Sequence, residues 1–137
     1  MSKVSFYLIE KKPLRQAELA CRLCKQISQQ HRIWIYCADQ AQCESLDELL
    51  WGFEATQFLP HAIDQIEQGI CLSTQPPKSG FDVCLNFSQL ALDPASLPHQ
   101  DLHIIEIVGN TEVEKQASRE VFKHYRNFGI HPVIHRI

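Results

Sequence analysis

Short apolar runs alternate with longer amphipathic runs along this 137-residue chain. The apolar runs are rich in β-branched and aromatic residues, which predicts buried strands. The runs between them repeat apolar residues at helical spacing, which predicts helices packed by one side. Strands that alternate with helices form parallel sheets covered by those helices. We therefore predict one α/β domain over residues 1–137, with three layers: a mainly parallel central sheet and helices on both of its faces.

The predicted strands are Val4–Ile9, Arg32–Cys37, Gly69–Ser73, Phe81–Phe87, Leu102–Val108 and Ile130–Ile137. The predicted helices are Leu14–Gln29, Gln40–Leu50 and Thr111–Phe128. Asp39 is a suitable N-cap for the second helix, and Asn110 or Thr111 for the third, because their short polar side chains can accept a hydrogen bond from the first turn.

The overall charge argues against a protein that coats nucleic acid by itself. The formal net charge is -3 and the isoelectric point is near 6.1, whereas such proteins carry an excess of lysine and arginine. No apolar run approaches the roughly 18 residues that span a bilayer, so we predict no association with a membrane. The N-terminus leads directly into a strand and lacks a signal-peptide cleavage site, which predicts a cytoplasmic protein.

Six cysteines are many for a chain of this length, but their placement favours packing over metal or redox chemistry. Cys21 and Cys24 form a CxxC within a predicted helix, without the strand and turn that precede a thioredoxin-like site. The histidine pairs His99–His103 and His131–His135 lie outside predicted helices, so a separation of four residues does not bring two rings to one metal. We predict no metal site and buried or helix-surface thiols.

The glycine patterns that bind phosphate groups are missing from the turns between strands and helices. The first such turn reads EKKPLRQ and the second CADQ, and neither contains glycine. Asp39 and Asp82 lie near strand ends, but capping or solvation is the more common role of a lone carboxylate at such a position. We predict neither catalytic residues nor a cofactor. The alternative that stays open is a small α/β nucleotide-binding enzyme without a standard glycine-rich loop.

The predicted helix 111–128 gathers positive charge along one side. On a helical projection five side chains fall within about a third of a turn: Lys115, Arg119, Phe122, Lys123 and Arg126. The apolar residues opposite them are expected to face the core: Val113, Ala117, Val121, Tyr125 and Phe128. Phe122 is then expected on the solvent side among four cations, which favours an anionic ligand with an apolar part. The alternatives are a solvated charged face and weak direct binding of single-stranded DNA.

Several segments carry a resemblance to a known family. SFYLI lies in the first predicted strand, RIWIYCADQAQCESLDELLW follows the first predicted helix, and KQASREVFKHYRNFG lies near the end. The most specific part is LDELLW, then six residues, then FLPH. With these segments the chain resembles, nearly end to end, the chi subunits of bacterial DNA polymerase III, which are clamp-loader accessory subunits. Residues 63–100 resemble the family only in general layout.

The resemblance implies a Rossmann-like fold and a non-catalytic adaptor in DNA replication. Members of the family bridge the polymerase holoenzyme, usually through the psi subunit, to the acidic C-terminal tail of single-stranded-DNA-binding protein, so DNA would be contacted mainly indirectly. The positions similar to the family's tail-binding residues are Lys115, Arg119, Phe122, Lys123 and Val108. The family often has tyrosine at the position of Phe122. Arg126 is a further candidate from the helical projection alone.

In the family's ligand, the C-terminal tail of single-stranded-DNA-binding protein, the last residue is a phenylalanine with a free carboxylate. The resemblance therefore implies a different contact for each of these residues. Arg119 would bind the terminal carboxylate through two hydrogen bonds, for which a guanidinium is well shaped. Lys115 and Lys123 would attract the aspartates of the tail. Phe122 and Val108 would flank the terminal ring.

A second group of large apolar residues lies around the loop after the second predicted helix: Trp51, Phe53, Phe58, Leu59, Pro60 and His61. Exposed aromatic side chains are typical anchors of protein interfaces. The resemblance implies that the positions of Trp51 and Phe58 bind the psi subunit, and that a DNA-repair helicase can use the same surface. The alternative is that these rings cap the core beneath the loop.

Overall fold

The computed structural model describes residues 3–10, 15–52, 60–67, 69–98 and 101–137. Within these residues seven strands form one sheet in the order β3-β4-β2-β5-β6-β1-β7, and every neighbouring pair is parallel. The strands are β1 (Lys3–Leu8), β2 (Ile33–Cys37), β3 (His61–Ile63), β4 (Ile70–Ser73), β5 (Val83–Phe87), β6 (His103–Val108) and β7 (Val133–Arg136). The helices are α1 (Gln16–Ile27), α2 (Gln40–Gly52) and α3 (Glu112–Asn127), with a short 3-10 turn, η1, at Pro94–Ser96.

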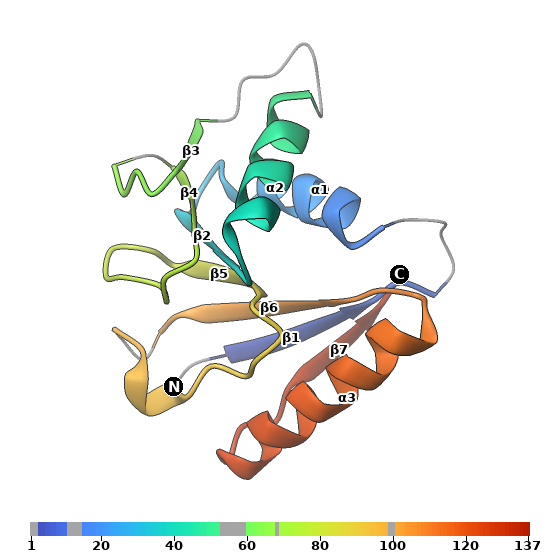
Figure 1. The fold of residues 1–137 in the computed structure, drawn as a ribbon. Helices are drawn as coiled ribbons and strands as arrows, with labels where there is room; N and C mark the ends of the chain where they lie inside the picture. The colour runs from blue at the N-terminus through green and yellow to red at the C-terminus, as the bar shows by residue number, and fades with distance from the viewer. Residues whose placement is uncertain (1–2, 11–14, 53–59, 68, 99–100) are drawn as a thin grey trace.

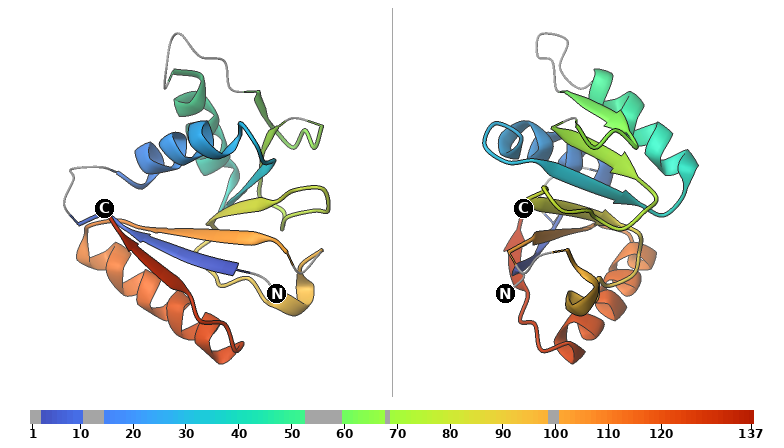
Figure 2. Two further views of the ribbon diagram at one scale, coloured as in Figure 1. Left: turned by 180° about the vertical axis from the view of Figure 1, so that it is seen from behind. Right: turned by 90° about the vertical axis from the view of Figure 1, so that its left-hand side faces the viewer.

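The helices cover the two faces of the sheet unequally (Figures 1 and 2). α1 and α2 lie together on one face, whereas α3 lies on the other and runs beside β7 at the sheet edge. Two groups of buried side chains correspond to these faces, one joined to α1 and α2 and the other to α3. The predicted three-layer α/β fold with a parallel sheet is confirmed.

The two helix caps are also confirmed. Asp39 Oδ1 accepts a hydrogen bond of 2.8 Å from the backbone N–H of Gln42, and Thr111 Oγ1 accepts one of 3.2 Å from Glu114. β3 was not predicted, because three residues are too few to show a hydrophobic period. The strand forms through its pairing with β4, which no local pattern encodes.

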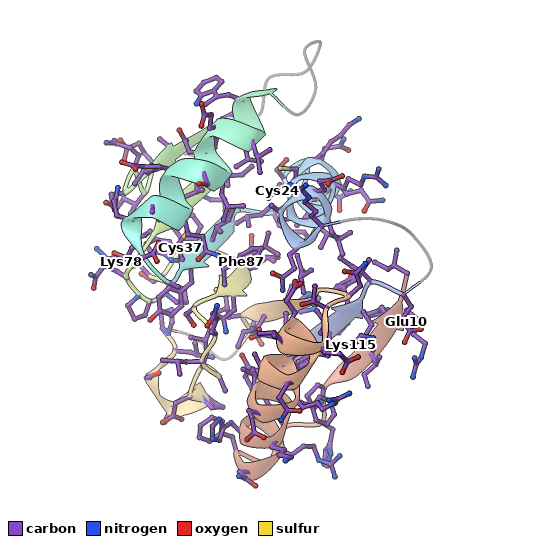
Figure 3. The ribbon with its side chains drawn as sticks, turned by 45° about the vertical axis from the view of Figure 1, so that its right-hand side comes forward. Glu10, Cys24, Cys37, Lys78, Phe87 and Lys115 are labelled. Atoms are coloured by element: carbon purple, nitrogen blue, oxygen red, sulfur yellow. The ribbon has the colours of Figure 1, made fainter. Side chains whose placement is uncertain are left out.

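All six cysteines are free and buried. Figure 3 labels Cys24 on α1 and Cys37 at the end of β2, both within the layer between these helices and the sheet. Burial raises the pKa of the Cys21 thiol to about 11, so little reactive thiolate forms there at neutral pH. The predicted packing role is confirmed. Within the described ranges, no three His, Cys, Asp or Glu side chains are placed to bind one metal ion.

No helix in the described part of the chain combines the length and the apolar composition that a membrane crossing requires.

Candidate functional site

α3 packs on the sheet through a side that includes Phe122. The Phe122 ring lies edge-on to the Phe6 ring, with centroids 5.2 Å apart, and is half-buried. The expectation of a solvent-facing Phe122 is therefore wrong. Val121 and Tyr125 are buried as predicted, but Val113 is 81% exposed.

The exposed residues among those expected in the core are Val113, Ala117 and Phe128. The contact side of the helix is rotated from the predicted one by roughly a fifth of a turn. It is centred near Ser118, whose small side chain is half-buried against the sheet. This orientation buries the Tyr125 ring fully and the Phe122 ring in part, and burial of aromatic rings contributes strongly to core energetics.

A groove lies between α3 and the strands β1, β6 and β7. The cavity has a volume of about 360 Å³, at the small end of the range for ligand pockets. The apolar side chains in its lining include Phe6, Leu8, Val108, Phe122 and Ile134. The polar side chains in its lining include those of Lys115, Ser118 and Arg119 on α3 and of Glu10, which follows β1.

The register of the sheet explains why these apolar side chains meet. Leu8 is paired with Val108 of β6, and Phe6 is paired with Ile134 of β7. Alternate residues of a strand point to the same face, so Phe6 and Leu8 both face α3. The groove thus lies over the carboxyl-terminal halves of β1 and β6, the part of a parallel strand where open α/β sheets usually bind their ligands.

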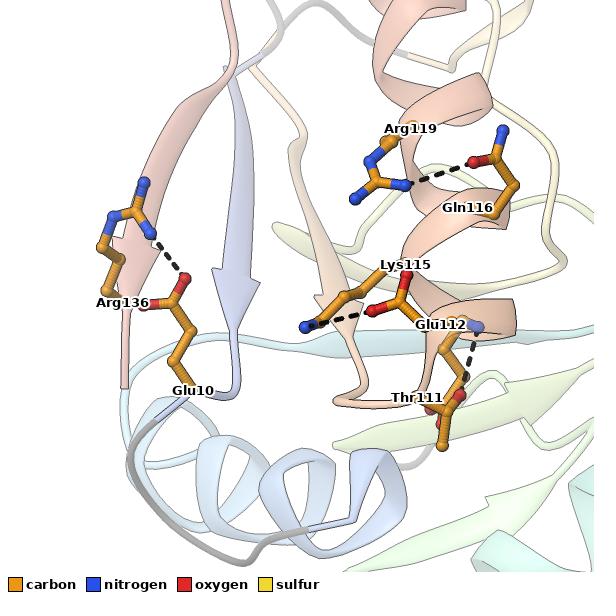
Figure 4. Close-up of polar contacts among 8 residues, drawn as sticks. Glu10, Thr111, Glu112, Lys115, Gln116, Arg119 and Arg136 are labelled. Carbon is orange, nitrogen blue, oxygen red and sulfur yellow. Dashed lines mark hydrogen bonds and ion pairs between the residues drawn. The ribbon is translucent and has the colours of Figure 1, made fainter.

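Two cations of α3 extend toward this groove (Figure 4). Lys115 Nζ lies 3.9 Å from Glu112 Oε1, and the Arg119 guanidinium donates a 3.2 Å hydrogen bond to Gln116 Oε1. These are weak, exposed contacts between neighbours on one helix. Both side chains can therefore turn toward an incoming anion at little cost.

The predicted tail-binding residues divide into two sets. Lys115, Arg119, Phe122 and Val108 line the groove together. Lys123 and Arg126 are exposed and do not line it. Lys123 Nζ lies 3.4 Å from Glu120 Oε1, so part of its charge is neutralised locally.

Sequence reasoning missed Phe6, Ile134 and Glu10 as lining residues. Phe6 and Ile134 are apolar residues in strands, and their sequence environment indicates burial alone. Glu10 follows a buried strand, which is a common place for a solvated charge. Only the pairing of β1 with β6 and β7 brings them beside α3.

A buried polar network holds the second half of α3. The Tyr125 hydroxyl donates a 2.6 Å hydrogen bond to Glu106 Oε2 and accepts one of 3.2 Å from the backbone N–H of Leu92. Asn86 Nδ2 donates a further 2.6 Å bond to Glu106 Oε2. Burial raises the pKa of the Glu106 carboxyl to about 8, although both donated hydrogen bonds act to lower it. This network fixes how α3 sits above β1 and β6.

The second predicted surface is described only in part, because Phe53, Phe58 and Leu59 lie outside the described residues. Trp51 at the end of α2 is 55% exposed, and Pro60 is also exposed. His61 is only 4% exposed and lies with its ring 4.5 Å from the Trp51 ring. His61 Nε2 is 3.2 Å from the backbone oxygen of Asp47. His61 is therefore buried beneath the exposed residues and packs against Trp51. We call the exposed residues Trp51 and Pro60 the Trp51 surface.

The residues considered for a nucleotide-binding enzyme have structural contacts. Asp39 caps α2, as described above, and Asp82 Oδ2 accepts a 3.1 Å hydrogen bond from the backbone N–H of Arg32. A Cβ atom at Gly109 would lie 1.6 Å from Glu114 Oε2. The glycine of the turn between β6 and α3 thus makes room for a carboxylate, and a negative charge there would oppose a bound phosphate.

Comparison with known proteins shows the family of this chain. The family model described as "DNA polymerase III chi subunit, HolC" matches residues 1–132. The curated DNA polymerase III subunit chi of Pseudomonas aeruginosa is 31% identical over 142 residues, an alignment that covers all of this chain and 98% of that protein.

Proposed function

Because the chain belongs to the DNA polymerase III chi subunit family, we propose that it is a non-catalytic adaptor that links the clamp loader to the acidic C-terminal tail of single-stranded-DNA-binding protein. Family membership itself gives the chain an accessory role in DNA replication. We propose in addition that the chain links the two partners, and we propose which residues bind each of them.

The observation that carries the proposal is the composition of the groove. An apolar floor made by strand and helix side chains lies beside Lys115 and Arg119 in one cavity. A peptide ending in phenylalanine presents an apolar ring and a carboxylate on the same residue. The ring would enter between Phe122 and Val108, and the carboxylate would accept hydrogen bonds from Arg119.

The remaining cations would act at longer range. Lys123 and Arg126 lie on α3 outside the groove lining, where they can attract the aspartates that precede the terminal residue. Such exposed charges mainly raise the rate of association, and salt weakens their effect.

The Trp51 surface is the proposed attachment to the polymerase side, through the psi subunit where one is present, or to a DNA-repair helicase. A large exposed ring held against buried His61 suits an interface anchor. Two separate attachments would raise the local concentration of polymerase near coated template without requiring tight binding at either one.

Fluorescence anisotropy tests the tail-binding part. A labelled peptide that copies the tail is titrated with the chain, and the titration is repeated with a peptide that lacks the terminal phenylalanine. We expect micromolar binding that the deletion abolishes. Equal binding of both peptides would show that general charge attraction suffices, and absence of binding at low salt would reject the assignment.

A thermal-shift measurement with ATP, NAD and FMN tests the nucleotide-binding alternative. A ligand that binds only the folded chain raises its melting temperature. We expect no shift with any of the three, and a shift with one of them would favour that alternative.

A further inference from the structure

A carboxylate lies in the lining of the groove that we propose for an acidic peptide. Glu10 follows β1 and lines the same cavity as Lys115 and Arg119. Its charge has the same sign as the proposed ligand. At the distances within one cavity, like charges repel by an amount that depends on solvent exposure, and the Glu10 side chain is about one-third exposed.

Arg136 of β7 neutralises this carboxylate. Arg136 Nη1 lies 2.5 Å from Glu10 Oε1, and Figure 4 shows the pair on the sheet side of the groove, across from Lys115 and Arg119. Arg136 is paired with Leu8 in the sheet register, so its side chain points to the same face as a residue of the groove floor.

Backbone hydrogen bonds also hold β7 beside β1, in addition to this ion pair. The backbone N–H of Glu10 donates a 2.8 Å hydrogen bond to the carbonyl of Ile137, and the N–H of Ile137 donates one of 2.8 Å to the carbonyl of Leu8. The backbone thus joins the ends of β1 and β7 directly. We therefore expect β7 to stay paired with β1 when the side-chain ion pair is removed.

We propose that the Glu10–Arg136 pair sets the charge selectivity of the groove. Glu10 opposes anionic peptides, and Arg136 offsets that opposition from the neighbouring strand. This inference rests on the proposed function, because it concerns the same groove and the same acidic class of ligand. It assigns specificity to β7, whose residues 133–136 lie beyond the part of the chain that the family model matches.

The test compares Glu10→Gln, Arg136→Gln and the double variant in the anisotropy titration with an acidic peptide ending in phenylalanine. We expect Glu10→Gln to tighten binding and Arg136→Gln to weaken it, each by about two- to fivefold at low salt, the range typical of partly exposed charges. The double variant should bind at least as tightly as the unaltered chain. All differences should shrink in ~0.5 M salt.

A matched control separates the groove from overall charge. Glu44→Gln changes the net charge by the same amount at an exposed site on α2, on the other face of the sheet, and should leave the affinity unchanged. A pair that only braces β7 would give weaker binding in both single variants, and that result, or unchanged binding in Glu10→Gln, would overturn the inference alone. Failure of the unaltered chain to bind would overturn both the inference and the proposed function.

Discussion

The groove and the Trp51 surface differ in how far they share side chains with the core. The groove floor includes core residues: Phe6 is 2% exposed and Val108 6% exposed, yet both line the cavity. Trp51 is instead 55% exposed, and its ring lies against the ring of buried His61. The shape of the groove is therefore tied to the stability of the fold, whereas the Trp51 surface can change without disturbing it.

This difference bears on how each surface can be tested. A substitution in the groove floor alters binding and folding together, so the groove is best tested at its charged rim. The Trp51 ring can be truncated directly. Four variants test this distinction, in order of decreasing expected effect on the stability of the chain or on its affinity for the tail peptide.

Phe6→Ala should lower the free energy of unfolding by about 3–5 kcal/mol, the usual cost of removing a buried aromatic ring, and should also abolish peptide binding. Urea denaturation measures the first effect. Val113→Ala, at an exposed apolar position on α3, is the control and should cost less than about 1 kcal/mol. Similar stability in the two variants would mean that the floor of the groove is not part of the core.

Glu106→Gln should flatten the pH dependence of stability. The folded-state pKa of Glu106 is raised from 4.5 to about 8, so between these values the folded chain holds a proton that the unfolded chain has released. The free energy of unfolding of the unaltered chain should then fall as the pH rises from about 5 to 8. The amide can still accept the Tyr125 hydrogen bond but does not titrate, so the variant should be more stable at pH 8 by a few kcal/mol.

Denaturation curves at several pH values measure this effect, with Glu44→Gln as the control for removal of an exposed carboxylate. Parallel curves for Glu106→Gln and the unaltered chain would contradict the proposed titration. A steep loss of peptide affinity over the same pH range would further tie the groove to the network that holds α3.

Arg119→Ala should weaken binding of the tail peptide at least about tenfold, because it removes the proposed partner of the terminal carboxylate. Arg126→Ala is the matched control: the same residue type on the same helix, outside the groove lining. Its effect should stay below about threefold. Equal losses in the two variants would indicate a diffuse basic face instead of a defined site.

Trp51→Ala should change the free energy of unfolding by less than about 1 kcal/mol, because most of the ring is already exposed. It should leave the affinity for the tail peptide unchanged and abolish binding of the psi subunit, as measured by calorimetry. Weaker peptide binding in this variant would show that the two surfaces are coupled.

The sequence predicted most of the elements because their signals are local. Strand and helix periods, and the caps at Asp39 and Thr111, depend on residues close together in the chain. β3 escaped prediction because its three residues gain their stability from β4. The prediction of which side of α3 faces the sheet was also wrong. Aromatic residues lie on both candidate sides, and the helical pattern alone does not show which side is buried.

The sequence likewise predicted part of the candidate site. The resemblance pointed to Lys115, Arg119, Phe122 and Val108, and these four line one groove. Glu10 follows β1 near the start of the sequence, whereas Ile134 and Arg136 belong to β7 near its end. Their approach depends on β7 pairing with β1, a contact between residues more than a hundred positions apart.

Local sequence patterns were thus enough to predict the α/β class, the parallel sheet, the helix caps and the basic character of α3, because each depends on residues that lie close together in the chain. Only the packing of separate segments shows that Phe122 contacts Phe6, that Tyr125 donates a hydrogen bond to buried Glu106, and that Glu10, which lines the groove, is paired with Arg136. Those features arise where separate segments meet, and their energies depend on burial and distance that no single segment encodes.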